Sequence, residues 1–290
     1  MKSPVFQLFS HQHQQAKALF LELGKEIKSA KAIALLEQLE FLELYSELLE
    51  KIHFEQKHLG YSLFFPLKTL KKSLKKIHHL KLVETGLKQR EKTLSLAFDS
   101  FKTYLNEQKR GMQKEAFDLM VGSSLKMWEE YLEKAHEASK GIKPLVLTTS
   151  IHQLVQEELS YLSKEVSSPI STQGFRDLFE GLRKVIILEN LLVHLGLNPI
   201  YLPQVHEELE QLKNGLKPWY ANHLNLQSLT HFIGQQEAVS KKYLDWVKEL
   251  KDEKVLEDSD LIGTETSNTF FMTAKFFNAK DGDILDLMDN

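Results

Sequence analysis

Residues 67–87 read LKTLKKSLKKIHHLKLVETGL. Leu67, Leu70, Leu74 and Ile77 recur at spacings of three and four, which places them on one face of an α-helix. The other side carries a row of lysines at the same periodicity: Lys68, Lys71, Lys72, Lys75 and Lys76. This pattern predicts an amphipathic helix with one face in an apolar core and positive charge on the opposite face.

Helical periodicity extends over most of residues 10–255, and it predicts an all-α fold. The chain has 290 residues but only 7 prolines and 13 glycines, which favours long helices. Helices are expected at about 27–49, 67–88, 91–140 with an interruption near 122–124, 151–164, 172–195, 203–213 and 224–251. Pro66 and Ser150 are interpreted as helix starts and 215–218 as a turn. Val146–Thr149 is the one run that favours a strand, and it is too short to build a sheet.

The composition excludes several kinds of site. The sequence contains no cysteine, so it has no disulfide, no thiolate nucleophile and no cysteine-bound metal. It also has no apolar run near the ~20 residues that a membrane-spanning helix needs. Met1–Pro4 leads into a polar stretch rather than the apolar core of a signal peptide, so a cytoplasmic location is expected.

An internal repeat predicts two similar halves. Leu67–Leu87 aligns loosely with Leu209–Leu229, at a corresponding place in the second part of the chain. We therefore expect two pseudo-symmetric helical-bundle halves, at about 15–140 and 150–253. Residues 1–14 form an N-terminal lead, and residues 254–290 form an acidic tail that contains phenylalanines.

Basic residues also recur near the start of each half. Lys28 and Lys31 lie in the first half, and Arg176 and Arg183 lie in the second. With the repeat, these positions make residues 15–250 resemble the conserved-histidine α-helical domain (CHAD) family. In that family each half opens with a helix of the pattern His-x-x-Arg-x-x-x-Lys/Arg-x-x-Arg. The resemblance implies two four-helix halves related by a pseudo-twofold axis, and binding of inorganic polyphosphate.

The chain departs from the family pattern at several positions. Leu21 and Gln173 stand where the two histidines are expected, and Gly24 stands at the first arginine of the first half. Glu180 reverses a basic position, and Ala221 replaces an aspartate farther along. These departures bear on the binding activity more than on the fold.

The lysine row is the strongest local feature. No acidic residue occurs between Glu55 and Glu84, whereas an ordinary exposed helix face mixes both signs of charge. A row of ammonium groups suits a polyanion, because repeated charges meet repeated phosphates and release counterions. The candidate anion-binding residues are Lys28, Lys31, Lys68, Lys71, Lys72, Lys75, Lys76, His78, His79, Arg176 and Arg183. The alternative interpretation is a solvated helix face with no ligand.

The second half is acidic at the corresponding surface, so at most a half-site is expected. Glu207, Glu208 and Glu210 lie there, together with Glu180. A long polyanion gripped by both halves would be repelled by these carboxylates.

Neither a metal site nor a catalytic site is expected. Two Glu-x-x-His pairs, Glu50 with His53 and Glu133 with His136, match the spacing used in di-iron bundles. With 29 glutamates and 12 histidines in the chain, chance alone accounts for about one such pair. No nucleophile motif and no phosphate-binding glycine loop occurs. We therefore expect a protein that is not an enzyme and needs no cofactor.

Charge is distributed unevenly, and this leaves two functional hypotheses. Residues 1–92 carry 16 Lys/Arg against 10 Asp/Glu, whereas residues 251–290 carry 4 against 10. The net charge of −3 argues against a nucleic-acid partner. One hypothesis is a binding module for polyphosphate or another phosphorylated anion. The other is a diverged scaffold that has lost anion binding and meets a protein partner, for example through the 254–290 tail.

Overall fold

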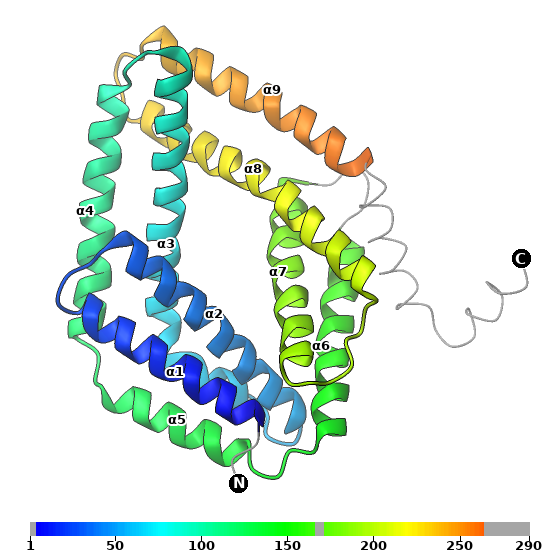
Figure 1. The fold of residues 1–290 in the computed structure, drawn as a ribbon. Coiled ribbons are helices and arrows are strands. Elements are labelled where there is room, and N and C mark those ends of the chain that lie inside the picture. The colour runs from blue at the N-terminus through cyan, green and yellow to red at the C-terminus, as the bar shows by residue number, and fades with distance from the viewer. Residues whose placement is uncertain (1–3, 166–170, 264–290) are drawn as a thin grey trace, which may run out of the picture. The chain divides into compact units, whose positions relative to one another are not determined.

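The computed structural model describes residues 4–165 and 171–263, with side chains at 4–162 and 171–253. Over these residues α-helices joined by turns and loops make up the fold, and there is no strand (Figure 1). The all-α prediction is confirmed. The helices are α1 (Pro4–Leu23), α2 (Ser29–Ile52), α3 (Leu59–Leu94), α4 (Asp99–Val121), α5 (Lys126–Ala138), α6 (Pro144–Glu165), α7 (Thr172–His194), α8 (Pro203–Gly234) and α9 (Lys241–Gly263). The predicted interruption near 122–124 is the turn between α4 and α5. The predicted 254–290 tail overlaps α9 up to Gly263, and its remainder lies outside the described residues.

The helices group into two compact units. The first contains Met1–Leu147 and Leu224–Ser240, and the second contains Thr148–His223 and Lys241–Asn290. This division differs from two consecutive halves, because the C-terminal part of α8 belongs with α1 to α5. The pseudo-twofold relation between halves stays a prediction.

In the first unit, α1 to α4 run up and down against their neighbours in sequence. Apolar residues of these helices and of α5 form the core of the unit, whose largest fully buried side chains include Trp128, Tyr45, Phe9, Phe98 and Phe101. α5 lies alongside α1 and closes the unit on that side (Figure 1).

The expectation of an N-terminal lead over residues 1–14 is wrong, since α1 begins at Pro4 and is part of this core. Phe9 is fully buried, stacks on Tyr45 at 4.4 Å between ring centroids and meets Tyr131 edge-on at 5.4 Å. Burying aromatic rings of this size stabilises the fold by a few kcal/mol each, on the order of 2–3. Polar residues lie between the apolar residues of α1, so the composition of the segment does not indicate that one face of it is buried.

The predicted start of a helix at Pro66 is also wrong, because α3 begins seven residues earlier, at Leu59. Glu50 of α2 caps this end, as its two carboxylate oxygens accept from the backbone N–H groups of His58 (3.2 Å) and Gly60 (3.0 Å). A Cβ at Gly60 would lie 2.7 Å from the Ser46 carbonyl oxygen, so the close approach of α3 to α2 needs glycine. Within the helix, Pro66 removes one backbone hydrogen bond, and the buried neighbours Phe64 and Leu67 offset this loss.

Other boundaries also differ from the predictions, and the helix expected over 224–251 is divided between α8 and α9. α8 continues through Pro218, where a turn was expected, and the adjoining Trp219 is fully buried and stacks on Phe175 at 5.1 Å. α6 begins at Pro144 instead of near Ile151, so the expected strand-like run and the expected cap at Ser150 lie within a helix. A proline in the first helical turn loses no hydrogen bond, which explains a start at Pro144.

The second unit is built on the α6–α7 hairpin. Ser171 caps α7, because its Oγ accepts from the Gly174 backbone N–H at 3.0 Å. Lys184 of α7 pairs with Glu158 of α6 at 3.2 Å. A Cβ at Gly181 would lie 2.8 Å from a side-chain oxygen of Glu158, so a glycine here permits close packing of the two helices.

Candidate functional site

α3 carries the predicted lysine row, and its amphipathic pattern is confirmed. Leu67, Leu70, Leu74 and Ile77 are all buried in the first unit, with at most 3% of their surface exposed. The lysines at 68, 71, 72, 75 and 76 lie on the half-buried to exposed side of the same helix. The apolar face therefore holds the ammonium groups in a row on a rigid element.

Tertiary neighbours supply the acidic partners that the local sequence lacks. Lys71 forms an ion pair with Glu43 of α2, and only 22% and 29% of the two side chains are exposed. Lys76 pairs with Glu115 of α4 at 2.8 Å. Both helices pack against α3, and each supplies a carboxylate to the lysine row.

A third carboxylate lies farther along α3. Glu84 is 15% exposed and sits between two ammonium groups, with Lys109 of α4 at 2.9 Å and Lys81 at 3.9 Å. Lys75 also has an interaction partner. The lysine row is therefore uninterrupted by acidic residues in the sequence, but carboxylates of neighbouring helices neutralise part of its charge in the folded protein.

Two aromatic rings continue the exposed face toward the start of α3. Tyr61 and Phe65 are 52% and 56% exposed, and their ring centroids lie 5.2 Å apart. The Lys68 ammonium lies 5.1 Å from the centre of the Tyr61 ring. Lys72, one helical turn farther on, is exposed. We call Tyr61, Phe65, Lys68 and Lys72 the aromatic–lysine edge. The spacing of four between the rings was a usable signal, which the sequence analysis missed.

Lys28 and Lys31 lie at the α1–α2 junction of the same unit and are paired locally. Lys28 meets Glu26 at 2.9 Å, and Lys31 donates to Glu22. The Lys31 ammonium, hydrogen-bonded to Glu22, holds the pKa of that carboxyl below its usual range. α4 reaches both regions, because Gln113 donates to the Ile27 carbonyl oxygen at 3.2 Å and Glu115 binds Lys76.

The remaining candidates fall in two places. His78 and His79 lie on α3 beyond the lysine row, with ring centroids 6.3 Å apart. Arg176 and Arg183 lie on α7 and so belong to the second unit. Arg183 pairs with Glu180 at 3.3 Å, and its guanidinium lies 5.9 Å from the Phe179 ring centre. The first unit therefore contains all the lysine candidates and neither arginine.

Three residues of the two Glu-x-x-His pairs make structural contacts, and Glu133, the fourth, is exposed. Glu50 caps α3, and His53 donates to the Ala138 carbonyl oxygen at 2.6 Å. The His136 ring lies 4.6 Å from the Phe6 ring. Over the residues whose side chains are described, no cluster of three or more ligand-type side chains could hold a metal ion.

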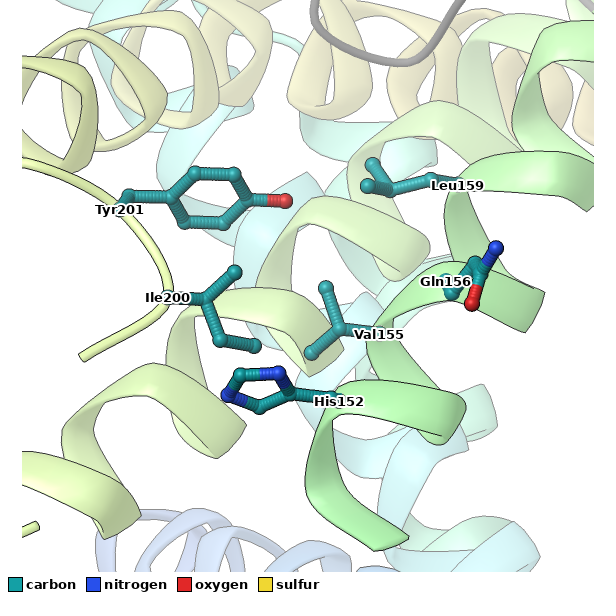
Figure 2. Close-up of a pocket in the computed structure, with 6 residues that line it drawn as sticks. All are labelled: His152, Val155, Gln156, Leu159, Ile200 and Tyr201. Atoms are coloured by element: carbon teal, nitrogen blue, oxygen red, sulfur yellow. The ribbon is translucent and has the colours of Figure 1, made fainter. Parts of the chain in front are cut away.

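A small hollow opens in the second unit, between α6 and the segment that leads into α8 (Figure 2). Its volume is about 80 Å³. The lining residues are His152, Val155, Gln156, Leu159, Ile200 and Tyr201. In Figure 2 the His152 ring, the Val155 side chain and the Ile200 side chain face one another, and the Tyr201 ring covers the opposite side. Such a space holds a few water molecules or a very small ligand.

A buried carboxyl secures one wall of this hollow. Glu189 of α7 is fully buried and accepts from the Ile200 backbone N–H at 2.9 Å. Desolvation raises the pKa of Glu189, and desolvation lowers the pKa of His152. This arrangement fixes the segment before α8.

Comparison with family models, with curated proteins and with solved structures finds no match to this chain. Among the described residues, no helix combines the length and the apolar character required to cross a membrane.

Proposed function

We propose that this protein is a non-catalytic helical binding protein whose α3 lysine row takes inorganic polyphosphate or another phosphorylated polyanion, as the CHAD resemblance implies. The observation that carries the proposal is the fixed row itself. Residues 68–76 of one rigid helix span about 12 Å. Burial of Leu70 and Leu74 directs the row away from the core. Several successive phosphates can therefore meet several ammonium groups at once.

The ion pairs set the expected strength of binding. A solvent-exposed pair such as Lys76 with Glu115 contributes only about 0–1 kcal/mol, so a polyanion with many charges can compete for its lysine. The more enclosed pair of Lys71 with Glu43 resists displacement more strongly. Binding should accordingly be weak and should decrease steeply with salt.

The scaffold hypothesis stays the alternative, and a specific observation favours it. Glu43 and Glu115 neutralise part of the row, while the exposed rings of Tyr61 and Phe65 are more typical of a surface that contacts protein. On this hypothesis α3 contributes the contact surface and no longer binds phosphates.

Titration of the full chain with long-chain polyphosphate at low and at physiological salt tests the proposal. The test variant replaces Lys71, Lys72, Lys75 and Lys76 by glutamine. The matched control makes the same charge change at exposed lysines of the first unit outside α3: Lys102, Lys126, Lys140 and Lys143.

We expect salt-sensitive binding that falls at least about tenfold in the test variant and changes little in the control. Equal loss in both variants would indicate a response to net charge alone and would contradict a site on α3. Absence of binding at low salt would remove the anion-binding hypothesis and leave the scaffold.

A further inference from the structure

The aromatic–lysine edge of α3 combines apolar rings with positive charge. A ligand that binds the whole edge would need both apolar groups and negative charge. Tyr61 and Phe65 expose more than half of their surface, although they lie beside a well-packed core. Lys68 and Lys72 continue the same helix face without interruption. A polyphosphate has no apolar part, so polyphosphate binding does not explain why the two aromatic rings are exposed.

The chain itself contains a segment of complementary composition. Residues 281–290 read DGDILDLMDN, in which four aspartates alternate with Ile284, Leu285, Leu287 and Met288. The segment carries no basic residue. Its aliphatic side chains suit exposed aromatic rings, and its carboxylates suit ammonium groups.

We propose that the aromatic–lysine edge binds the C-terminal segment 281–290 of this chain. The aliphatic residues cover the Tyr61 and Phe65 rings, and the aspartates pair with Lys68 and Lys72. The edge spans about 16 Å along α3, from residue 61 to residue 72. Ten residues cover about 15 Å as a helix and about 33 Å when extended, so the segment is long enough in either form.

This inference does not depend on polyphosphate binding, although the two share Lys68 and Lys72. A segment seated on the edge would compete with a polyanion for these ammonium groups. The two aromatic rings distinguish peptide binding from polyphosphate binding, because only the peptide has apolar side chains that can contact them.

The experiment measures binding of a labelled 281–290 peptide to the full chain by fluorescence anisotropy. In the receptor the four aspartates of its own segment are changed to asparagine, so that the segment does not compete. The test variants are Tyr61→Gln with Phe65→Gln, and Lys68→Gln with Lys72→Gln. The matched control is Leu145→Gln with Val146→Gln, which removes two exposed apolar side chains elsewhere in the first unit. Thermal unfolding verifies that each variant is folded.

We expect each test variant to weaken peptide binding by about tenfold or more, and the control to change it less than about twofold. The ring variant should keep its affinity for polyphosphate, which distinguishes failure of this proposal from failure of the proposed function. Several results would overturn the proposal: no peptide binding at low salt, equal binding by all variants, or equal binding of a scrambled peptide. Dimerisation that the ring variant abolishes, without peptide binding, would assign the edge to a second copy and would also overturn it.

Discussion

The Lys76 ammonium donates to both carboxylate oxygens of Glu115, at 2.8 and 2.9 Å, although the two residues are 39 positions apart. Lys76 is a lysine of the predicted polyanion row, and Glu115 lies on the neighbouring helix α4. Lys71 likewise forms an ion pair with a residue distant in sequence, Glu43 of α2. An uninterrupted basic stretch in sequence is thus a mixed-charge surface in the folded protein.

Removing the competing carboxylates should strengthen polyanion binding. We expect Glu115→Gln to raise the affinity for polyphosphate by about two- to fivefold at low salt, since an exposed pair contributes little and its loss frees Lys76. The gain should diminish at physiological salt, because screening weakens both the pair and the ligand contact. Titration of the two proteins side by side checks this, with the exposed Glu107→Gln of the same helix as control. An unchanged affinity would show that Lys76 takes no part in binding.

Protonation of His13 should destabilise the first unit. Its Nε2 donates to the Trp128 carbonyl oxygen at 2.8 Å, and its Nδ1 has no hydrogen-bond partner among the described residues. Burial lowers the pKa of His13, while the bond to Trp128 raises it and nearby Lys17 lowers it.

Because the folded-state pKa of His13 lies below the unfolded value of about 6.5, the unfolded chain takes up the proton first. The contribution of neutral His13 is therefore complete above that pH and is lost as the pH falls below it. We expect the midpoint temperature of unfolding to decrease as the pH is lowered from 7.5 to 5.5. The decrease should be smaller in His13→Phe. Thermal unfolding at several pH values measures this. His11→Phe is the control, since His11 is exposed. Identical pH profiles for His13→Phe and the wild type would contradict the assignment.

The Tyr131 hydroxyl should contribute measurably to stability. It donates to the Leu42 carbonyl oxygen at 2.6 Å and lies 2.7 Å from Ser46 Oγ, with all three residues buried. Tyr131→Phe removes the donor and leaves buried polar atoms with fewer partners. We expect the free energy of unfolding to fall by about 1–2 kcal/mol. Urea denaturation measures this, with the exposed Tyr61→Phe as control. Equal stability of both variants would mean that the bond contributes nothing net.

Gly86 allows α3 to approach Asn225 within the first unit. A Cβ at this position would lie 2.6 Å from Asn225 Oδ1, and Asn225 is only 3% exposed, so its amide has little room to move. Gly86→Ala should therefore destabilise the protein by about 1–3 kcal/mol. Gly111→Ala on α4 is the matched control. Nothing lies within 4 Å of its added Cβ, and it should stabilise the helix by about 0.5–1 kcal/mol. Urea denaturation of both variants tests the pair, and a stabilised Gly86→Ala would contradict the close approach.

Several features of the fold could be predicted because they depend on neighbours close in sequence. The spacing of Leu67, Leu70 and Leu74 gives one apolar face, and the structure buries that face in α3. The break between α4 and α5 follows from local residues in the same way. Helical hydrogen bonds join residues four apart, so this information is contained in short windows.

Other features needed contacts between distant residues. α3 extends back to Leu59 past Pro66 because Glu50 of α2 caps it, and α8 passes Pro218 beside the buried Trp219. These contacts outweigh the cost of one missing backbone bond, and no local window contains them.

The candidate site also depends partly on local sequence and partly on contacts between distant residues. Helical geometry alone places five lysines on one face of one helix, so this part of the site could be predicted from the spacing of the residues. Helix packing sets which of these lysines meet Glu43 and Glu115, and which lie beside the exposed rings of Tyr61 and Phe65. Charge and exposure depend on what packs against a helix face, and that packing joins residues far apart in the chain.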